Sequence, residues 1–540
     1  DVLKNWIPVS AVIIAFSYLL YYQCISYGYV LDDLLVIQEN KFTKEGFSGI
    51  WDIFTTESFT GYFGEKKDLV QGNRYRPLSI ATFAFEYGVF GKENPTFSHF
   101  VNILLYALTG ILLWMVLVPL FRNFTENKWW LSIPFIAAMI FIAHPIHTEA
   151  VANIKGRDEL MAMLFSLGAL YGAIKYMDNP SRKWMIISMC SYFLGLLSKE
   201  NAITLPLAII MIEIFFLQSK KTFLILKDYR IVVLSILFIS IILFVAFRFS
   251  SGIFNPLPPD AITNFVEITP ANFLFTQFSV LLKYLQLLLF PINQNIDYDI
   301  TLSTSFFEIK TLISFILLAA ILVLGVLLFN KSRIISFGIF WFFVTIAVES
   351  SIIPISDLIF EHRTYLPSYG FMLILTTAIF TLLWPKNKNF ALAIFGLIII
   401  SNAVLTYQRN KVWQDEITLW TDAIKKSPNK ARPYVIRGNA YEDLNKMDDA
   451  ILDYNKAIEL QPNYTLAFTN RGYAHKHKGN WQKAIQDYNK SISLNPLNAL
   501  AYTNRGVIYG NLKQWDKAIE DYTAAIKVDN RFVLAYSNRA

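Results

Sequence analysis

The sequence has little charge and almost no cysteine. Of its 540 residues, 16% are charged and 54% are hydrophobic, which excludes an ordinary soluble globule and indicates a lipid bilayer as the partner. Cys24 and Cys190 lie in separate apolar stretches, so a disulfide framework and a clustered zinc site are excluded. The net charge of +7 does not indicate nucleic acid, because basic residues that flank apolar spans report membrane orientation.

The fingerprints of soluble nucleotide-using enzymes are also absent. The sequence contains no glycine-rich phosphate loop, no nucleophile elbow and no kinase motif set. An activated donor would therefore have to be carried by a lipid and reach its site through the bilayer. Because the sequence opens on Asp1 and stops at Ala540 inside a repeat, we expect it to be part of a longer protein.

What is present first is a series of long apolar runs. A membrane-spanning helix needs about 20 mostly apolar residues. We predict about eleven such helices, near residues 6–24, 98–120, 130–143, 159–177, 183–198, 201–218, 230–248, 309–329, 334–350, 368–384 and 390–406. A further apolar segment, 273–291, carries Lys283 near its middle and ends at Pro291, and we interpret it as an interfacial or re-entrant helix.

Basic residues in the short loops predict the orientation of these spans. Lysine and arginine accumulate on the cytoplasmic side. The informative basic residues are Lys220, Lys221, Lys227, Arg230, Lys331, Arg333, Lys386 and Lys388. Placing them inside puts the polar loops on the extracytoplasmic side, provided that segment 273–291 does not cross. These loops are 25–76, 144–158, 249–272, 292–308 and 351–367.

A 34-residue period begins after the last apolar run. It is visible in the dipeptides Arg437-Gly438, Arg471-Gly472 and Arg505-Gly506 and in Pro428, Pro462 and Pro496. The period resembles the tetratricopeptide repeat, whose paired helices stack into a solenoid with a groove suited to an extended peptide. We therefore predict a membrane domain over 1–408 and about 3.5 repeats over 409–540. The alternative role for the repeats is a spacer or dimer contact.

An acidic pair, Asp32 and Asp33, follows the first predicted span. Adjacent carboxylates at a membrane interface are costly unless they are solvated, paired or used. In a transferase that inverts at the anomeric carbon, one carboxylate takes the proton of the acceptor hydroxyl. Asp32 suits that role, and Asp33 would position the acceptor or the base. A helix cap or a solvated turn explains the pair equally well.

Other polar clusters fall on the same predicted side of the membrane. Arginine can bind a lipid phosphate with two hydrogen bonds, although basic residues at an interface also serve as simple anchors. A His-x-x-His-x-Glu set can bind a metal, but here it lacks helical spacing and is interrupted by Pro145, so we expect none. A structural ion-pair network is the alternative for Glu361 and Arg363. The candidate substrate-binding residues are Arg74, Arg76, His144, His147, Glu149, Arg157, Lys199, Glu200, Glu361, His362, Arg363 and Tyr365.

These clusters, taken in order, resemble a known family. The segments that carry the resemblance are Leu31-Asp32-Asp33, Trp51 to Phe54, Tyr75-Arg76-Pro77-Leu78, His144-Pro145-Ile146-His147-Thr148-Glu149-Ala150-Val151, Gly156-Arg157, Lys199-Glu200 and Glu361-His362-Arg363-Thr364-Tyr365-Leu366-Pro367-Ser368. The chain resembles the transmembrane and tetratricopeptide repeat-containing proteins of the glycosyltransferase C superfamily, and specifically their bacterial relatives. It departs from the animal members in the loop 249–272.

The resemblance implies an all-α fold: a polytopic glycosyltransferase C bundle of about eleven spans followed by a repeat solenoid. It implies an inverting transferase that moves a sugar, mannose in the best-known members, from a polyprenyl or dolichyl phosphate to serine or threonine of a protein in the repeat groove. Asp32 and Asp33 fall on the superfamily's catalytic position. No cofactor is expected, since the lipid-phosphate sugar is a substrate and the mannosyltransferases generally work without a metal.

Two alternatives stay open at this point. The chain could transfer sugar to an oligosaccharide or cell-envelope glycan, with the repeats binding a partner. It could also be a non-enzymatic scaffold or transporter whose repeats dock soluble proteins. Richness in isoleucine, lysine and asparagine favours a bacterial inner membrane with periplasmic repeats, whereas a eukaryotic source would mean the endoplasmic reticulum membrane with lumenal repeats.

Overall fold

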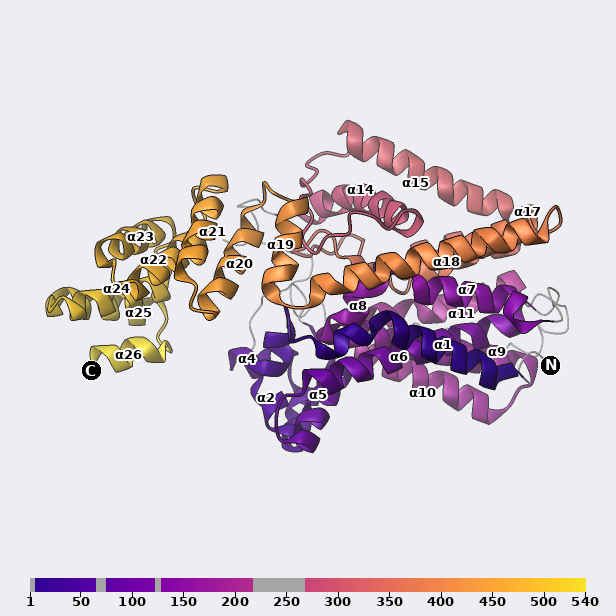
Figure 1. Ribbon diagram of the computed structural model, residues 1–540, viewed down its shortest axis with the longest axis horizontal. Helices are drawn as coiled ribbons and strands as arrows, with labels where there is room; N and C mark the ends of the chain where they lie inside the picture. Colours follow the sequence, from indigo (N-terminus) through magenta and orange to yellow (C-terminus); the bar gives the residue numbers. More distant parts are fainter. Residues whose placement is uncertain (1–4, 65–73, 122–127, 217–267) are drawn as a thin grey trace. The chain divides into compact units, whose positions relative to one another are not determined.

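The computed structural model describes residues 5–64, 74–121, 128–216 and 268–540 (Figure 1). Every helix or strand element of this part is helical, which confirms the predicted all-α class. The chain divides into two compact units. Among the described residues, unit 1 comprises those up to 216 together with 268–294 and 301–415, and unit 2 comprises 295–300 and 416–540.

Unit 1 contains the long apolar helices. Six helical stretches in the described part are long and apolar enough to cross a membrane. They are Trp6–Ser26, Pro95–Leu120, Ile154–Asp178, Pro270–Leu289, Ile309–Leu328 and Lys388–Trp413. A seventh candidate pairs Ile133–Ala143 with Pro145–Ala152 across a 54° bend, and two shorter apolar helices are Arg333–Ile346 and Ser368–Leu382. The chain is a multi-pass membrane protein; the total of eleven spans stays a prediction, and 230–248 lies outside the described residues.

The segment interpreted from sequence as an interfacial helix forms α14, Pro270–Leu289. Its length and composition suffice to cross a membrane. The helix begins sharply because the Thr269 side chain accepts from the backbone N–H of Asn272 and Pro270 occupies the first turn. If α14 crosses, the predicted orientation of every later element inverts.

Helices of unit 1 pack closely through small residues. Helix α6, Pro95–Leu120, lies against α1, Trp6–Tyr21, and α9, Arg157–Asp178 (Figure 1). Between α16, Arg333–Ile346, and α17, Ser368–Leu382, a Cβ added at either Gly338 or Gly370 would lie 2.5 Å from the carbonyl oxygen of the other glycine. Such contacts allow helix backbones to approach closely in a membrane.

Short helices carry six of the candidate residues, namely His147, Glu149, Glu200, Glu361, His362 and Arg363. The remaining elements of unit 1 are η2 Tyr22–Ser26, η3 Leu34–Gln38, α2 Lys41–Lys44, η4 Gly46–Gly49, α3 Ile50–Thr55, α4 Thr60–Phe63, α5 Pro77–Phe90, η5 Trp129–Leu131, α7 Ile133–Ala143, η6 Pro145–His147, α8 Thr148–Ala152, η7 Ile154–Gly156, α10 Arg182–Ser198, η8 Glu200–Thr204, α11 Leu205–Phe216, α15 Ile309–Leu328, η9 Glu361–Thr364, α18 Lys388–Asn410 and η10 Lys411–Trp413. A small core that includes Val36, Ile53, Phe59 and Phe83 joins the N-terminal short helices to α5.

Unit 2 consists of the predicted helical repeats. Its helices are α19 Glu416–Lys426, α20 Ala431–Asp443, α21 Met447–Leu460, α22 Thr465–His477, α23 Trp481–Leu494, α24 Ala499–Asn511, α25 Trp515–Val528 and α26 Val533–Arg539. In each repeat a glycine of the first helix faces a buried tyrosine of the second, so that a Cβ at Gly472 would come within 2.9 Å of Tyr488. This contact explains why glycine recurs at that register.

Candidate active site

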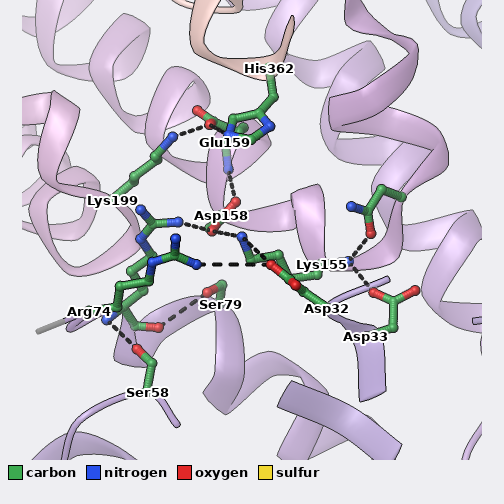
Figure 2. Close-up of polar contacts among 12 residues, drawn as sticks. Asp32, Asp33, Ser58, Arg74, Ser79, Lys155, Asp158, Glu159, Lys199 and His362 are labelled. Carbon is green, nitrogen blue, oxygen red and sulfur yellow. Dashed lines mark hydrogen bonds and ion pairs between the residues drawn. The ribbon is translucent and has the colours of Figure 1, made fainter. Parts of the chain in front are cut away.

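The two adjacent aspartates have opposite environments (Figure 2). Asp33 is 1% exposed, and its two carboxylate oxygens accept backbone N–H groups from Val30 at 3.0 Å and Lys155 at 2.7 Å. The preceding Leu31 has a φ of 57°, a left-handed conformation that makes the chain turn sharply. Asp33 therefore ties the loop after the first helix to the start of α9.

Asp32, by contrast, keeps 45% of its side chain exposed. Its Oδ2 lies 3.7 Å from Lys155 Nζ and 3.9 Å from Arg74 Nη1. Asp32 is thus a solvent-accessible carboxylate flanked by two cations.

The same two cations line a small pocket that is partly open to solvent. Arg74 is positioned because Ser58 donates its backbone N–H to the Arg74 carbonyl at 2.9 Å and its guanidinium lies over the Phe59 ring. The pocket is lined by Val36, Ser58, Phe59, Arg74, Arg76, Ser79, Ile80, Phe83, Lys155 and Asp158. It combines cationic groups with an apolar wall, a chemistry suited to the phosphate end of a lipid.

Arg76 is held between two carboxylates at the rim of this pocket. Its guanidinium donates to Glu200 at 2.6 and 3.0 Å and to Asp158 at 2.7 Å. Pro77 starts α5 directly after it, so the side chain leaves from a fixed point. Arg76 lines the pocket, but its donors are committed to neighbouring carboxylates.

A second polar cluster, which we call the Lys199 cluster, comprises Lys199, Glu159, Glu349 and His362. The Lys199 ammonium contacts Glu159 and, at 2.6 Å, Glu349. Burial lowers the pKa of Lys199, but the two carboxylates more than offset this and raise it above its usual value. The residue therefore remains charged. Asp158 and Glu159 are consecutive, so this cluster adjoins the pocket (Figure 2).

His362 faces the same cluster from η9. Glu149 accepts hydrogen bonds from the His362 backbone N–H at 2.9 Å and from its Nδ1 at 2.6 Å. Burial, and then the charges of Lys199 and Lys155, hold the pKa of His362 well below its usual value. The imidazole is therefore neutral at pH 7. Glu159, Glu349 and His362 offer ligand atoms within 4.8 Å of one another, a grouping able to hold a metal ion.

Three other predicted residues are engaged in packing. Arg157 is fully buried, contacts Glu86, Asn102, Thr82 and the Ser98 carbonyl, and lies over the Phe83 ring. His144 bonds the Leu288 carbonyl through Nε2 and the Ile146 N–H through Nδ1. His147 lies between Tyr106 and Ser368. These partners favour structural roles over contact with a substrate. Both ring nitrogens of His144 and of His147 are already hydrogen-bonded to protein groups.

The segment that follows Phe360 is similarly anchored. Glu361 accepts from the Gln294 side chain at 2.7 Å. Arg363 donates to the carbonyl of Asp357 at 2.8 Å and lies over the Phe360 ring. Tyr365 packs against Tyr106, Phe141 and His147. These contacts of Glu361 and Arg363 are hydrogen bonds to an amide and a backbone carbonyl, and His362 faces the Lys199 cluster.

Sequence reasoning did not select four residues that the structure brings to these clusters. They are Lys155, Asp158, Glu159 and Glu349. Lys155 stands two positions before Arg157, and only the fold shows that Lys155 faces Asp32 whereas Arg157 faces the core. Glu349, an acidic residue at the end of an apolar run, is itself a signal of paired burial.

Family models match the C-terminal repeats. A model described as "TPR repeat" matches residues 438–479, and one described as "Tetratricopeptide repeat" matches 465–498 and 499–532. The crystal structure of MamA is 29% identical and covers 23% of this chain and 72% of its own, with a TM-score of 0.22.

Two curated relatives extend over the membrane unit as well. Protein O-mannosyl-transferase F38B6.6 of Caenorhabditis elegans is 27% identical over 82% of this chain and 61% of its own length. Protein O-mannosyl-transferase TMTC3 of Homo sapiens is 26% identical over 80% of this chain and 49% of its own length. The chain thus spans about half to three fifths of these relatives. Over about four fifths of its length the chain is similar to the TMTC-type protein O-mannosyl-transferases, and it carries tetratricopeptide repeats.

Proposed function

We propose that the chain is an inverting membrane mannosyltransferase that uses a polyprenyl- or dolichyl-phosphate sugar and modifies serine or threonine of a polypeptide. Its relatives are named protein O-mannosyl-transferases, and that name supplies the reaction class. The observation that carries the proposal for this chain is the position of Asp32. It is an accessible carboxylate whose two flanking cations, Arg74 and Lys155, also line the pocket with the apolar wall.

Asp32 is the proposed general base. Its carboxylate takes the proton from the acceptor hydroxyl as that oxygen forms a bond to the anomeric carbon of the sugar. The bond between that carbon and the phosphate oxygen breaks, and its electron pair leaves with the lipid phosphate. Attack from the face opposite the leaving group inverts the anomeric centre.

Arg74 and Lys155 stabilise the negative charge that develops on the departing phosphate. Both lie beside Asp32, so the cations and the proposed base face the same reacting centre. Fixed cations directed at the point where charge appears are among the strongest contributions to catalysis. Arg76 and Asp158 hold the rim of the pocket in place through their ion pair.

Asp33 is a positioning residue in this proposal. It holds the backbone of Val30 and Lys155 and thereby fixes the neighbouring base and one of the two cations. Arg157, His144, His147, Glu361, Arg363 and Tyr365 support the surrounding loops. Glu200 keeps Arg76 aligned.

The repeats are proposed to present the acceptor polypeptide. Stacked helical repeats form an elongated binding surface, and the distribution of basic loops predicts that they share the extracytoplasmic side with Asp32. For a bacterial source the repeats would be periplasmic and the lipid a polyprenyl phosphate. For a eukaryotic source they would be lumenal and the lipid dolichyl phosphate. No metal or other cofactor is needed for the steps above.

The test uses membranes that contain the full chain, a polyprenyl-phosphate mannose and an acceptor peptide. Removing a general base lowers the rate by about 100-fold or more, and we expect this loss for Asp32→Asn. Asp52→Asn is the matched control, because Asp52 lies on α3 in the same polar stretch, whereas the ion pairs of Arg74 and Lys155 go to Asp32 and Asp158. Undiminished transfer by folded Asp32→Asn would overturn the assignment.

A further inference from the structure

The Lys199 cluster has the composition of a metal centre. Glu159 comes from the first turn of α9, Glu349 follows α16, and His362 lies in η9. The ligand atoms of these three residues lie within 4.8 Å of one another. Two carboxylates and one imidazole suit Mn²⁺, Co²⁺ or Zn²⁺.

The histidine is oriented as a ligand would be. Glu149 accepts the Nδ1 proton of His362 at 2.6 Å, and the backbone N–H of His362 donates to the same carboxylate at 2.9 Å. Nε2 is then directed to the cluster, 3.7 Å from Glu159 Oε1. A carboxylate that holds the far nitrogen of a histidine is the usual support of metal-bound imidazole.

Two buried acceptor atoms at the cluster lack a donor. Among the described residues, Glu349 Oε2 and Asn201 Oδ1 have no hydrogen-bond partner, although both side chains are more than nine-tenths buried. Asn201 belongs to the cluster because its Nδ2 donates to Glu159 Oε2 at 3.3 Å. Unsatisfied buried oxygens are costly, and a cation bound by Glu349 would satisfy its unpaired oxygen.

Lys199 already supplies a positive charge at this point. Its ammonium is fully buried and contacts both Glu159 and Glu349. A divalent ion in its place would put two positive charges between the same two carboxylates. An ammonium and a metal ion cannot both occupy the space between the same two carboxylates.

We propose that Glu159, Glu349 and His362 form a divalent-cation site, with Glu149 as support, in which the Lys199 ammonium takes the place of the metal. The built-in cation holds α9, the end of α16 and η9 together without a metal supply. Removing the ammonium opens the site to a transition-metal ion. The inference is independent of the proposed reaction, since it concerns binding alone.

The experiment measures Co²⁺ binding to the full chain in detergent, without donor or acceptor, by visible absorption and by thermal midpoint. A lost supporting residue weakens metal binding by about 10–100-fold. We expect variants that also lack a ligand to bind Co²⁺ about 100-fold more weakly than Lys199→Ala. Lys199→Ala should bind Co²⁺ and gain thermal stability from it, whereas the unchanged chain should do neither.

Matched double variants identify the ligands. Lys199→Ala combined with His362→Ala should lose the binding, and Lys199→Ala combined with Glu149→Gln should weaken it. Lys199→Cys is a second route to the site, because it also removes the ammonium and leaves a small side chain.

Three outcomes would overturn the proposal. The first is equal Co²⁺ affinity of the unchanged chain and Lys199→Ala, which would mean that the ammonium does not occupy the site. The second is binding by Lys199→Ala that persists without His362. The third is failure of Lys199→Ala and Lys199→Cys to fold even with Co²⁺ present, because a bound divalent ion would replace the lost charge.

Discussion

The ion pairs of the membrane unit and those of the repeats are built on different plans. In unit 1, Arg157 pairs with Glu86 and Lys199 with Glu159, joining helices that are distant along the chain, and both cationic side chains are fully buried. In unit 2, each repeat pairs an arginine with an aspartate 16 residues later, and the arginine is about one fifth exposed.

The two plans predict different losses of stability when one partner of an ion pair is substituted. A buried charge without its partner is strongly destabilising, whereas a partly hydrated one costs less. The pairs of unit 1 also share partners, since Asp158 meets Arg76 and Lys155. We therefore expect unit 1 to behave as one cooperative network, and the repeats as separate modules with nearest-neighbour coupling.

Arg157→Met should have the largest effect. The substitution leaves Glu86 buried without its cation, which costs about 3–5 kcal/mol, and it also removes donors to Asn102 and the Ser98 carbonyl. The free energy of unfolding of the full chain in detergent should fall accordingly, or the variant should fail to accumulate. Arg157→Met combined with Glu86→Gln should recover part of the loss. A loss below about 1 kcal/mol, typical of exposed pairs, would show that the network is not cooperative.

Asp33→Asn comes next, and its neighbour is the matched control. The amide keeps one acceptor oxygen for two backbone N–H groups, so one buried donor loses its partner, at about 1–3 kcal/mol. Asp32→Asn should change stability little, because that carboxylate is half exposed, while it abolishes transfer. The pair of variants separates folding from chemistry at consecutive residues. Equal stability losses would contradict the division of roles.

Much of the fold follows from local sequence signals. The repeat period gives the helices of unit 2, and the Arg-Gly dipeptides fix the register of the Arg–Asp pairs, because every partner lies 16 residues away. The apolar runs likewise predict the long helices of unit 1. In both cases the helices can be predicted from residues that are close together in the sequence.

The candidate site is less predictable because its contacts are long-range. Lys155 and Arg157 are two residues apart, yet one faces Asp32 and the other is buried beside Glu86. His144 and His147 form a metal-like motif in the sequence, but the histidine that joins a metal-like group is His362, more than 200 positions later. The basic and acidic residues could be selected from sequence, and their partners could not.

Arg471→Met tests whether the repeats are modular. Arg471 donates to both oxygens of Asp487, at 2.6 and 3.0 Å, and to Asn455 at 2.7 Å. Hydrogen bonds to charged groups contribute about 1.5–3 kcal/mol, and partial hydration places the expected loss at the lower end. Hydrogen exchange of the repeat amides in the full chain measures it. Arg505→Met, with the same contacts one repeat later, should give a similar loss; destabilisation that spreads to the amides of unit 1 would break the comparison.

Lys478→Ala should have the smallest effect. Its ammonium contacts Asp448, but the side chain of Asp448 is 83% exposed, so water and salt screen the attraction. Exposed pairs contribute about 0.2–1 kcal/mol in double-mutant cycles, and we expect a change near the lower limit that disappears at high salt. The same hydrogen-exchange measurement, at low and high ionic strength, separates this pair from the Arg471 pair, whose two parallel hydrogen bonds should resist screening. Equal salt sensitivity of the two variants would contradict this explanation. It would mean that the partial burial of the repeat arginines does not strengthen their ion pairs with aspartate.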